Sequence, residues 1–243
     1  MKTADYLYIL SNISSRYFMV AGGFFLICYV LLYKRIAAAK IQQKLPSRSD
    51  YLREISYSLM TMVLFAFIPL LIVRNPAIRP YTSLYPEIGD KGMLYYWCTF
   101  PVMLIMHDTY FYWIHRLMHH PRLYRIFHSV HHASTNPSPW AAYAFHPLEA
   151  VLEIGIFVIF MFTIPIHRSQ VFIFFLGSII YNAYGHLGWE IYSKRFRTGL
   201  IGRWINTSTA HNAHHKYFTG NYGLYFLFWD RLMGTIRTEQ DSI

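Results

Sequence analysis

The sequence predicts an all-α fold, a multi-pass helical bundle embedded in a membrane. Hydrophobic residues make up 54% of the 243-residue chain and charged residues only 14%, too few charges to cover a soluble protein of this size. The apolar residues gather into long uncharged runs, and the basic residues flank these runs instead of lining one face. The formal net charge of +10 therefore indicates membrane topology, and no nucleic-acid partner is expected.

The apolar runs predict three membrane spans and one helical hairpin. Tyr17–Tyr33 and Ile55–Val73 carry no charge, and as helices rising about 1.5 Å per residue they are long enough to cross a bilayer. Gly92–Ile114 forms the third span. The shorter runs Ile154–Ile166 and Val171–Tyr184 predict a hairpin that spans the membrane or re-enters it.

The basic residues predict the orientation of these elements. Of the 22 Lys and Arg residues, 16 lie in segments 34–53, 114–150 and 187–243, which places those segments, and a histidine-rich helical cap built from them, on the cytoplasmic side. We expect one domain over residues 1–243, with a membrane anchor region in 1–91 and a catalytic region in 92–237. The membrane is either a bacterial inner membrane or the endoplasmic reticulum.

Eight of the 13 histidines fall into three patterned groups, HRLMH, HSVHH and HNAHH. Residues three and four apart on a helix share a face, so each group can present several imidazoles to one point. Imidazole alone fits iron, zinc, copper or nickel. Eight histidines exceed the three or four ligands of a single zinc site, and so they predict a centre of two metals. The predicted ligands are His115, His119, His128, His131, His132, His211, His214 and His215.

Few acidic residues accompany these groups, and Asp108 is the best placed of them. It precedes His115 by seven residues and His119 by eleven, and so shares a helical face with both. We predict that Asp108 orients the tautomer of a metal-bound histidine and offsets positive charge. The isolated histidines His107, His120 and His167 are left outside the site, with His120 expected at a helix end.

Six motifs follow one another in the second half of the chain. They are Asp108–His119 (DTYFYWIHRLMH), His128–His132 (HSVHH), His146–Glu149 (HPLE), His211–His215 (HNAHH), Asn221–Gly223 (NYG) and Trp229–Thr235 (WDRLMGT). Together they resemble the fatty acid hydroxylase and sterol desaturase superfamily of membrane-bound di-iron enzymes. The match covers about half of the chain, and a concatenation of this length is highly specific.

The resemblance implies oxidation of an unactivated C–H bond in a lipid substrate. It implies two non-haem iron ions, O2 as co-substrate, and electrons from a separate protein of the cytochrome b5, ferredoxin or reductase type. We favour hydroxylation, with desaturation as its closest rival. The other class of function that fits is a membrane metal transporter or sensor, but the clusters lie together on one side and not along successive spans.

The resemblance also adds three residues to the site. His186 is implied as a ninth ligand, since family members carry a histidine on the helix before the last cluster. His146 of the HPLE motif is expected beside the metals without binding them. Some fatty acid 2-hydroxylases have a further histidine four residues after the position of His186, where this chain has Glu190. Glu190 is therefore a carboxylate ligand, a group that supports a ligand, or a surface residue.

Overall fold

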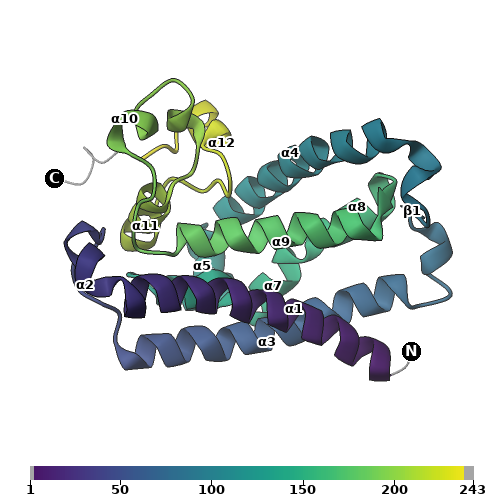
Figure 1. The fold of residues 1–243 in the computed structure, drawn as a ribbon, viewed down its shortest axis with the longest axis horizontal. Helices are drawn as coiled ribbons and strands as arrows, with labels where there is room; N and C mark the ends of the chain where they lie inside the picture. The colour runs from purple at the N-terminus through teal and green to yellow at the C-terminus, as the bar shows by residue number, and fades with distance from the viewer. Residues whose placement is uncertain (1–2, 238–243) are drawn as a thin grey trace.

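Four long helices dominate the structure, a computed structural model that describes residues 3–237 of the 243-residue domain expected (Figure 1). They are α1 (Thr3–Phe25), α3 (Arg48–Val73), α4 (Met93–Met118) and α9 (Arg168–Gly185). A π-helical turn, Leu26–Leu31, continues α1. The predicted helical fold is confirmed in the described part of the chain.

Shorter elements connect the long helices and form one end of the molecule. The α-helices among them are α2 (Tyr33–Ile36), α5 (Pro121–Phe127), α6 (Ser129–His132), α7 (Pro147–Glu153), α8 (Gly155–Thr163), α10 (Lys194–Arg197), α11 (Ser208–Tyr217) and α12 (Phe228–Leu232). Single 3-10 turns lie at Ala37–Ala39, Arg79–Tyr81, Ile88–Lys91, Pro139–Tyr143 and Gly202–Trp204. Two short strands, β1 (Leu84–Tyr85) and β2 (Ile166–His167), pair in parallel with Leu84 opposite Ile166.

The first helix is longer than the sequence predicted. The expected span started at Tyr17 because Arg16 ends the uncharged run, but the helix begins at Thr3 and passes through Arg16 without a break. A charged residue interrupts a hydropathy pattern without interrupting backbone hydrogen bonds, because arginine is a good helix former. Arg16 therefore belongs to α1, and its side chain is partly buried.

Local sequence signals explain where several helices begin. Ser47 and Asp50 form a reciprocal capping box that starts α3. Pro121 and Pro147 occupy the first positions of α5 and α7, where a missing N–H costs nothing. Thr207 caps α11, the helix that carries the last histidine group.

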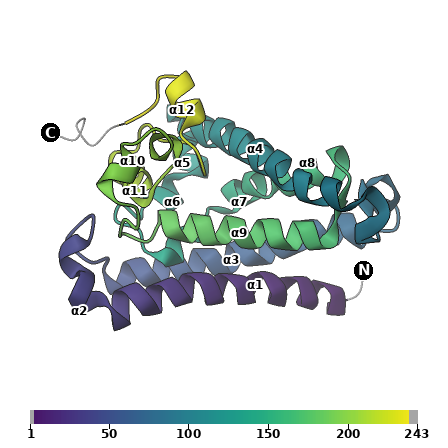
Figure 2. The same cartoon turned by 45° about the horizontal axis from the view of Figure 1, so that its top comes forward.

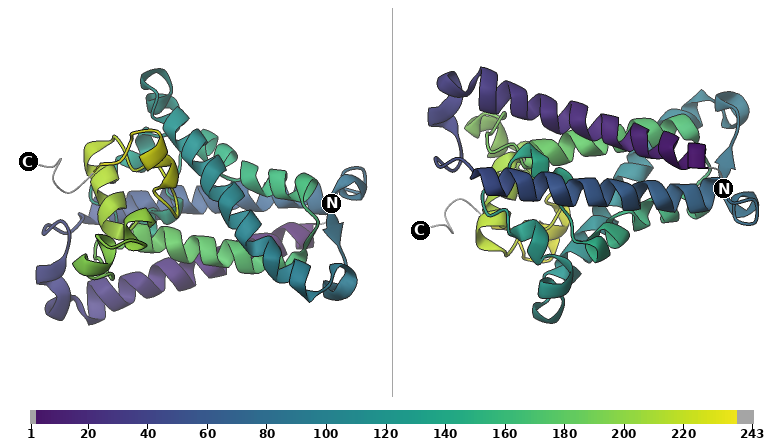
Figure 3. Two further views of the ribbon diagram at one scale, coloured as in Figure 1. Left: turned by 90° about the horizontal axis from the view of Figure 1, so that it is seen from above. Right: turned by 90° about the horizontal axis from the view of Figure 1, so that it is seen from below.

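The long helices form a bundle with the short helices gathered at one end. α1 and α3 lie side by side in all views, and α9 lies against α1 (Figure 2). Seen from above, α4 crosses the bundle obliquely, and seen from below α1 and α3 cover the face (Figure 3). Helices α5, α6, α10, α11 and α12 form a cap at the end where α4 and α9 finish, whereas β1 and β2 close the opposite end.

One backbone carbonyl in the 3-10 turn Pro139–Tyr143 connects this turn to two of the long helices. The backbone oxygen of Trp140 accepts hydrogen bonds from Tyr17 Oη at 2.8 Å and from Ser58 Oγ at 2.9 Å. Tyr17 and Ser58 are fully buried and belong to α1 and α3. The two N-terminal helices thus fix the loop that leads into the HPLE segment.

Two helices in the described part of the chain are long and apolar enough to cross a membrane, Thr3–Leu31 and Arg48–Val73. Large apolar side chains are also exposed on the outer faces of the bundle, among them Val63 of α3, Ile105 of α4 and Ile173 of α9. An exposed apolar surface of this extent is typical of a membrane or protein contact.

Candidate metal centre

Nine histidines come together where α4, α6, α9 and α11 meet at the cap. They form two groups, the first made of His115, His119, His128, His132 and His214 and the second of His131, His186, His211 and His215. Within each group the nearest ring nitrogens all lie within 4.8 Å of one another. The nine are the histidines named as ligands from the sequence, and the structure brings all of them together.

The first group takes side chains from segments far apart in the sequence, among them α4 and α11. His115 Nε2 lies 2.9 Å from His128 Nε2. His132 Nε2 lies 3.1 Å from His119 Nε2 and 3.0 Å from His214 Nε2. Two ligands at right angles on one metal, each about 2.1 Å from it, are about 3 Å apart. These separations are therefore those of ligands on a common metal ion.

The second group has the same spacing. His186 Nε2 lies 3.1 Å from both His211 Nε2 and His215 Nε2, and those two nitrogens are 3.1 Å apart. His131 Nε2 is 3.4 Å from His186 Nε2. Three nitrogens at equal distances around one point match three ligands on one face of a coordination polyhedron.

Backbone carbonyls decide which nitrogen of each ring carries hydrogen. The Nδ1 atoms of His115, His186, His214 and His215 lie 2.7–2.9 Å from the oxygens of Tyr222, Asn182, Gly220 and Ser134, respectively. A carbonyl only accepts, so each Nδ1 donates, and in a neutral ring Nε2 keeps its lone pair.

Burial keeps these rings neutral. It lowers the pKa of His186 to about 4 and that of His215 well below its ordinary value, and for His215 the neighbouring rings add to the effect. The Nε2 lone pairs of His186 and His215 therefore face one another at 3.1 Å with no hydrogen between them. A shared cation relieves this repulsion, and so the donor set fits a metal ion.

The two groups touch, and this favours one centre of two metals over two separate sites. The rings of His132 and His215 have centroids 4.8 Å apart, and those of His128 and His131 are 5.2 Å apart. Adjacent residues of the HSVHH motif, His131 and His132, belong to different groups. One helical turn thus supplies histidines to both groups.

Glu149 is the carboxylate that contacts the histidines. His128 Nδ1 lies 2.6 Å from Glu149 Oε1, and both side chains are almost completely buried. Burial raises the pKa of Glu149 and lowers that of His128, so burial disfavours the charged form of each partner. A metal on His128 Nε2 would favour the charged carboxylate, in the carboxylate–histidine–metal arrangement common to such sites. The sequence analysis did not predict this role for Glu149, although Glu149 is the last residue of the HPLE motif.

A tight loop after α11 supplies two of the carbonyls that orient the ligands. Asp230 accepts hydrogen bonds from the backbone N–H groups of Tyr222 and Gly223 at 2.9 Å each. Gly220 has φ of +74°, and a Cβ on it would lie 2.6 Å from the oxygen of Thr235, so the position requires glycine. The NYG and WDRL motifs therefore fix the conformation of this loop, and the loop carbonyls orient the rings of His214 and His115.

Asp108 has a different role from the one predicted. Its Oδ1 accepts hydrogen bonds from the backbone N–H groups of Tyr225 at 2.8 Å and Phe226 at 3.1 Å. Seven residues correspond to about 10 Å along a helix, which puts its short side chain out of reach of the His115 ring. The prediction that Asp108 orients a histidine tautomer is wrong, because Tyr222 O does this for His115. Asp108 instead anchors the chain that follows the 220–223 loop.

Glu190 lies outside both groups of clustered nitrogens. One carboxylate oxygen accepts from Tyr184 Oη at 2.6 Å and from the backbone N–H of Tyr192, and the other accepts from the backbone N–H and the hydroxyl of Thr209. These hydrogen bonds lower the pKa of Glu190 against the effect of its burial. Of the alternatives left open, the geometry favours a supporting role, since Glu190 fixes the first turn of α11.

The remaining sequence candidates cap helices. His146 Nδ1 accepts from the backbone N–H of Leu148 at 3.3 Å and starts α7, so it does not join either group of ligands. His120 caps the start of α5, and not the end of α4 as a terminal cap would. His167 is the second residue of β2, between α8 and α9, and it caps the start of α9.

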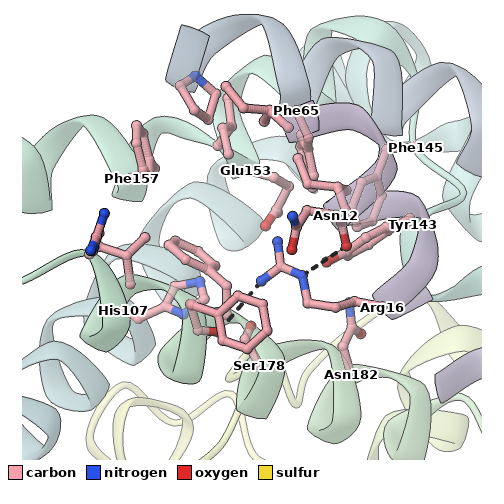
Figure 4. Close-up of a pocket in the computed structure, with 18 of the residues that line it drawn as sticks. Asn12, Arg16, Phe65, His107, Tyr143, Phe145, Glu153, Phe157, Ser178 and Asn182 are labelled. Carbon is pink, nitrogen blue, oxygen red and sulfur yellow. Dashed lines mark hydrogen bonds between the residues drawn. The ribbon is translucent and has the colours of Figure 1, made fainter. Parts of the chain in front are cut away.

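A cavity of about 710 Å³ lies inside the bundle, and Figure 4 shows part of its lining. Its walls include Phe111 and Phe145, whose rings lie 5.0 Å and 5.2 Å from the rings of His115 and His131. His107, which the sequence left outside the site, lines this cavity, and its Nδ1 lies 3.0 Å from Tyr225 Oη. Cavities of this size and apolar character are typical of small-molecule sites.

Comparison with known proteins gives one family match and several relatives. Residues 100–235 match the family model described as fatty acid hydroxylase. The chain is 34% identical to a delta(7)-sterol 5(6)-desaturase of Gibberella zeae, covering 68% of this chain and 50% of the relative. It is 35% identical to a lathosterol oxidase of Mus musculus, covering 66% and 52%. The chain thus spans about half the length of these curated relatives. No solved structure matches it.

Proposed function

The chain belongs to the fatty acid hydroxylase family, and from this we propose that it is a membrane-bound di-iron oxidoreductase that uses O2 to oxidise a C–H bond of a lipid. The observation that carries the proposal is the set of nine histidines in two touching groups, with all but His119 buried. A metal transporter or sensor is not favoured, because such a protein distributes its ligands along a path.

The proposed ligands are the nine histidines in their two groups, with Glu149 supporting His128. Two iron ions held there would supply the activation of O2 and the oxidation of the C–H bond. The protein itself would position the lipid and exclude water from the site of reaction. The walls formed by Phe111 and Phe145 hold a lipid against the histidines and keep water away from the reacting carbon.

We propose three or more membrane spans with the cap on the cytoplasmic side. Support comes from the two helices that qualify by length and composition, from the exposed apolar faces of α4 and α9, and from the basic loops around the cap. This fits an endoplasmic reticulum or bacterial inner membrane protein.

An electron-donor protein is part of the proposal, because the reaction does not balance without one. Inserting one oxygen atom of O2 into a C–H bond and reducing the other to water consumes two electrons and two protons. Removing two hydrogens from the lipid while O2 becomes two waters has the same requirement. A cytochrome b5, ferredoxin or reductase type of protein would supply the electrons at the cap.

Desaturation is the second candidate reaction. Relatives are named sterol desaturase and lathosterol oxidase, which supports removal of two hydrogens as an alternative to the hydroxylation expected from the sequence.

Metal analysis and lipid analysis together test this function. We expect about two tightly bound irons per chain after purification from membranes. Lipid extracts from a host that expresses the chain should contain a product heavier by one oxygen for hydroxylation, or lighter by two hydrogens for desaturation. Weak, exchangeable binding of various metals with an unchanged lipid profile would contradict the proposal and favour metal handling.

A further inference from the structure

The two groups of histidines differ in the part of the chain that supports them. Three rings of the first group are oriented by two loop carbonyls and by Glu149, and all three contacts come from within residues 100–235, the part that matches the family model. The neighbours of the second group also include residues 36–54, which lie outside that part. Among them is the linker, defined here as residues 36–44, which leads from the end of α2 towards α3 at the cap end of the bundle (Figure 1).

The linker binds the segment that directly follows His186. Trp189 Nε1 donates to the oxygen of Ile36 at 2.8 Å. The backbone N–H of Ile41 donates to the oxygen of Gly188 at 2.9 Å. The chain that leaves α9 after its ligand is therefore fixed to the linker by two hydrogen bonds.

The loop that orients His215 is held by α3. Nδ1 of His215 donates to the oxygen of Ser134 at 2.9 Å, and Arg53 Nη2 donates to Ser134 Oγ at 3.2 Å. Further along the loop, the hydroxyl of Ser138 donates to the carboxyl of Glu54, and both side chains are fully buried. The carbonyl behind His215 thus belongs to a loop that is attached to the first turns of α3 at two points.

Gln42 of the linker connects this loop to α11. Its Nε2 donates to the oxygen of Thr135 and to Asn212 Oδ1, at 2.9 Å each. Asn212 is buried and follows His211 directly in the HNAHH motif. A primary amide has two N–H donors, and Gln42 uses both of them. Without this side chain, the buried Oδ1 of Asn212 loses its partner, which is costly for a buried acceptor.

Lys40 fixes the linker in this position. It is 3% exposed, although lysine is seldom buried. Its Nζ donates to Asn136 Oδ1 at 3.0 Å and to the oxygen of Gln42 at 2.9 Å, and it lies over the ring of Trp189, 5.6 Å from the centroid. Burial lowers the pKa of Lys40 to about 8, and the amine donates hydrogen bonds in either protonation state.

We propose that Lys40 and Gln42 are positioning residues for the metal of the second group. The inference rests on the proposed function, because the metal itself belongs to that proposal. A ligand ring is only as well placed as the backbone that carries it and the groups that hydrogen-bond to it. Through Trp189, Thr135 and Asn212, the linker contacts the chain beside three ligands of the second group. The two metals should therefore depend on different parts of the chain.

Metal binding by the full chain tests the proposal without requiring turnover. The metal-free chain in nanodiscs is dialysed anaerobically against Fe²⁺ over a range of concentrations, and the bound iron is counted. We expect Gln42→Ala and Lys40→Met to bind one ion about tenfold to a hundredfold more weakly than the wild type, as for other partners of metal-bound histidines, and the other ion equally well. Lys44→Met, the same change at an exposed lysine of the linker, should bind both ions as the wild type does.

A background that lacks the second site identifies the affected ion. The pair of substitutions His211→Ala and His215→Ala leaves two histidines in the second group, so the remaining ion is that of the first group. On this background Gln42→Ala should not change iron affinity, whereas Glu149→Gln should lower it. Equal weakening of both ions by the linker variants, no weakening, or a further loss from Gln42→Ala on this background would overturn the proposal.

Hydrogen exchange of the wild-type chain tests the same coupling if the variants fail to fold. Coupling between two sites is reciprocal, so a metal in the second group must stabilise the bound linker. The N–H of Ile41, which is bonded to the oxygen of Gly188, should exchange more slowly after Fe²⁺ is added. An unchanged exchange rate in the iron-loaded chain would contradict the positioning role.

The same titrations separate this inference from the proposed function. A wild-type chain that binds fewer than two ions contradicts the two-metal centre of the proposed function. Two ions that bind to the linker variants as tightly as to the wild type contradict the positioning role alone.

Discussion

The candidate metal centre and the cavity beside it differ in how their side chains are held in place. In the metal centre, hydrogen bonds at Nδ1 fix the orientation of the rings. Tyr222 O binds Nδ1 of His115, and Glu149 binds Nδ1 of His128. In the cavity, Phe111 and Phe145 are fixed only by packing. Polar geometry is lost when one partner is removed, whereas apolar packing adapts. The metal centre should therefore respond to single substitutions far more sharply than the cavity walls.

The largest expected effect is the loss of a ligand. His214→Ala removes a nitrogen of the first group, and His128→Ala removes the one supported by Glu149. We expect both variants to lose product formation and bound iron while still entering the membrane, measured by lipid analysis and metal content of the purified protein. His120→Ala, an exposed helix cap beside the site, is the matched control and should retain both. Normal turnover in both ligand variants would remove the basis for the di-iron assignment.

An intermediate effect is expected at Glu149, which contacts the proposed ligand His128. Glu149→Gln keeps an oxygen that accepts from His128 but removes the negative charge. We expect a loss of about tenfold to a hundredfold in metal affinity or activity, as for other partners of metal-bound histidines. Titration with a competing chelator measures it. Glu149→Ala, which also removes the acceptor, should lose more, and equal affinity in all three proteins would show that Glu149 merely fills space.

The smallest effect is expected at Glu190, and it distinguishes a carboxylate that supports α11 from one that binds a metal. Glu190→Gln retains an acceptor oxygen for either Tyr192 or Thr209 but not for both, because the two residues bond different carboxylate oxygens. The substitution therefore weakens the hydrogen bonding that holds the first turn of α11. Hydrogen bonds to charged groups contribute about 1.5–3 kcal/mol. We therefore expect a lower thermal stability of the full chain with unchanged iron content. Loss of iron without loss of stability would instead make Glu190 a ligand.

The sequence predicted the metal centre better than the cavity, for a physical reason. Ligands three and four residues apart are local, so HSVHH already implies its own geometry. Glu149 was visible in a motif but not its partner, since 21 residues separate it from His128. Nothing in the sequence indicated that Arg16 and Glu153 line one cavity, because only the tertiary structure brings these parts of α1 and α7 to it. Arg16 even misled, by shortening the first predicted span.

The order of the ligands along the chain has a consequence for biosynthesis. His214 completes the first group, and His211 and His215 complete the second, so both groups wait for α11. The earliest of these histidines, His115, lies in α4, and the helices α1, α3, α4 and α9 all precede α11 in the chain. Neither group of histidines can be complete before α11 has been synthesised, and so metal binding by the full set follows the synthesis of α11.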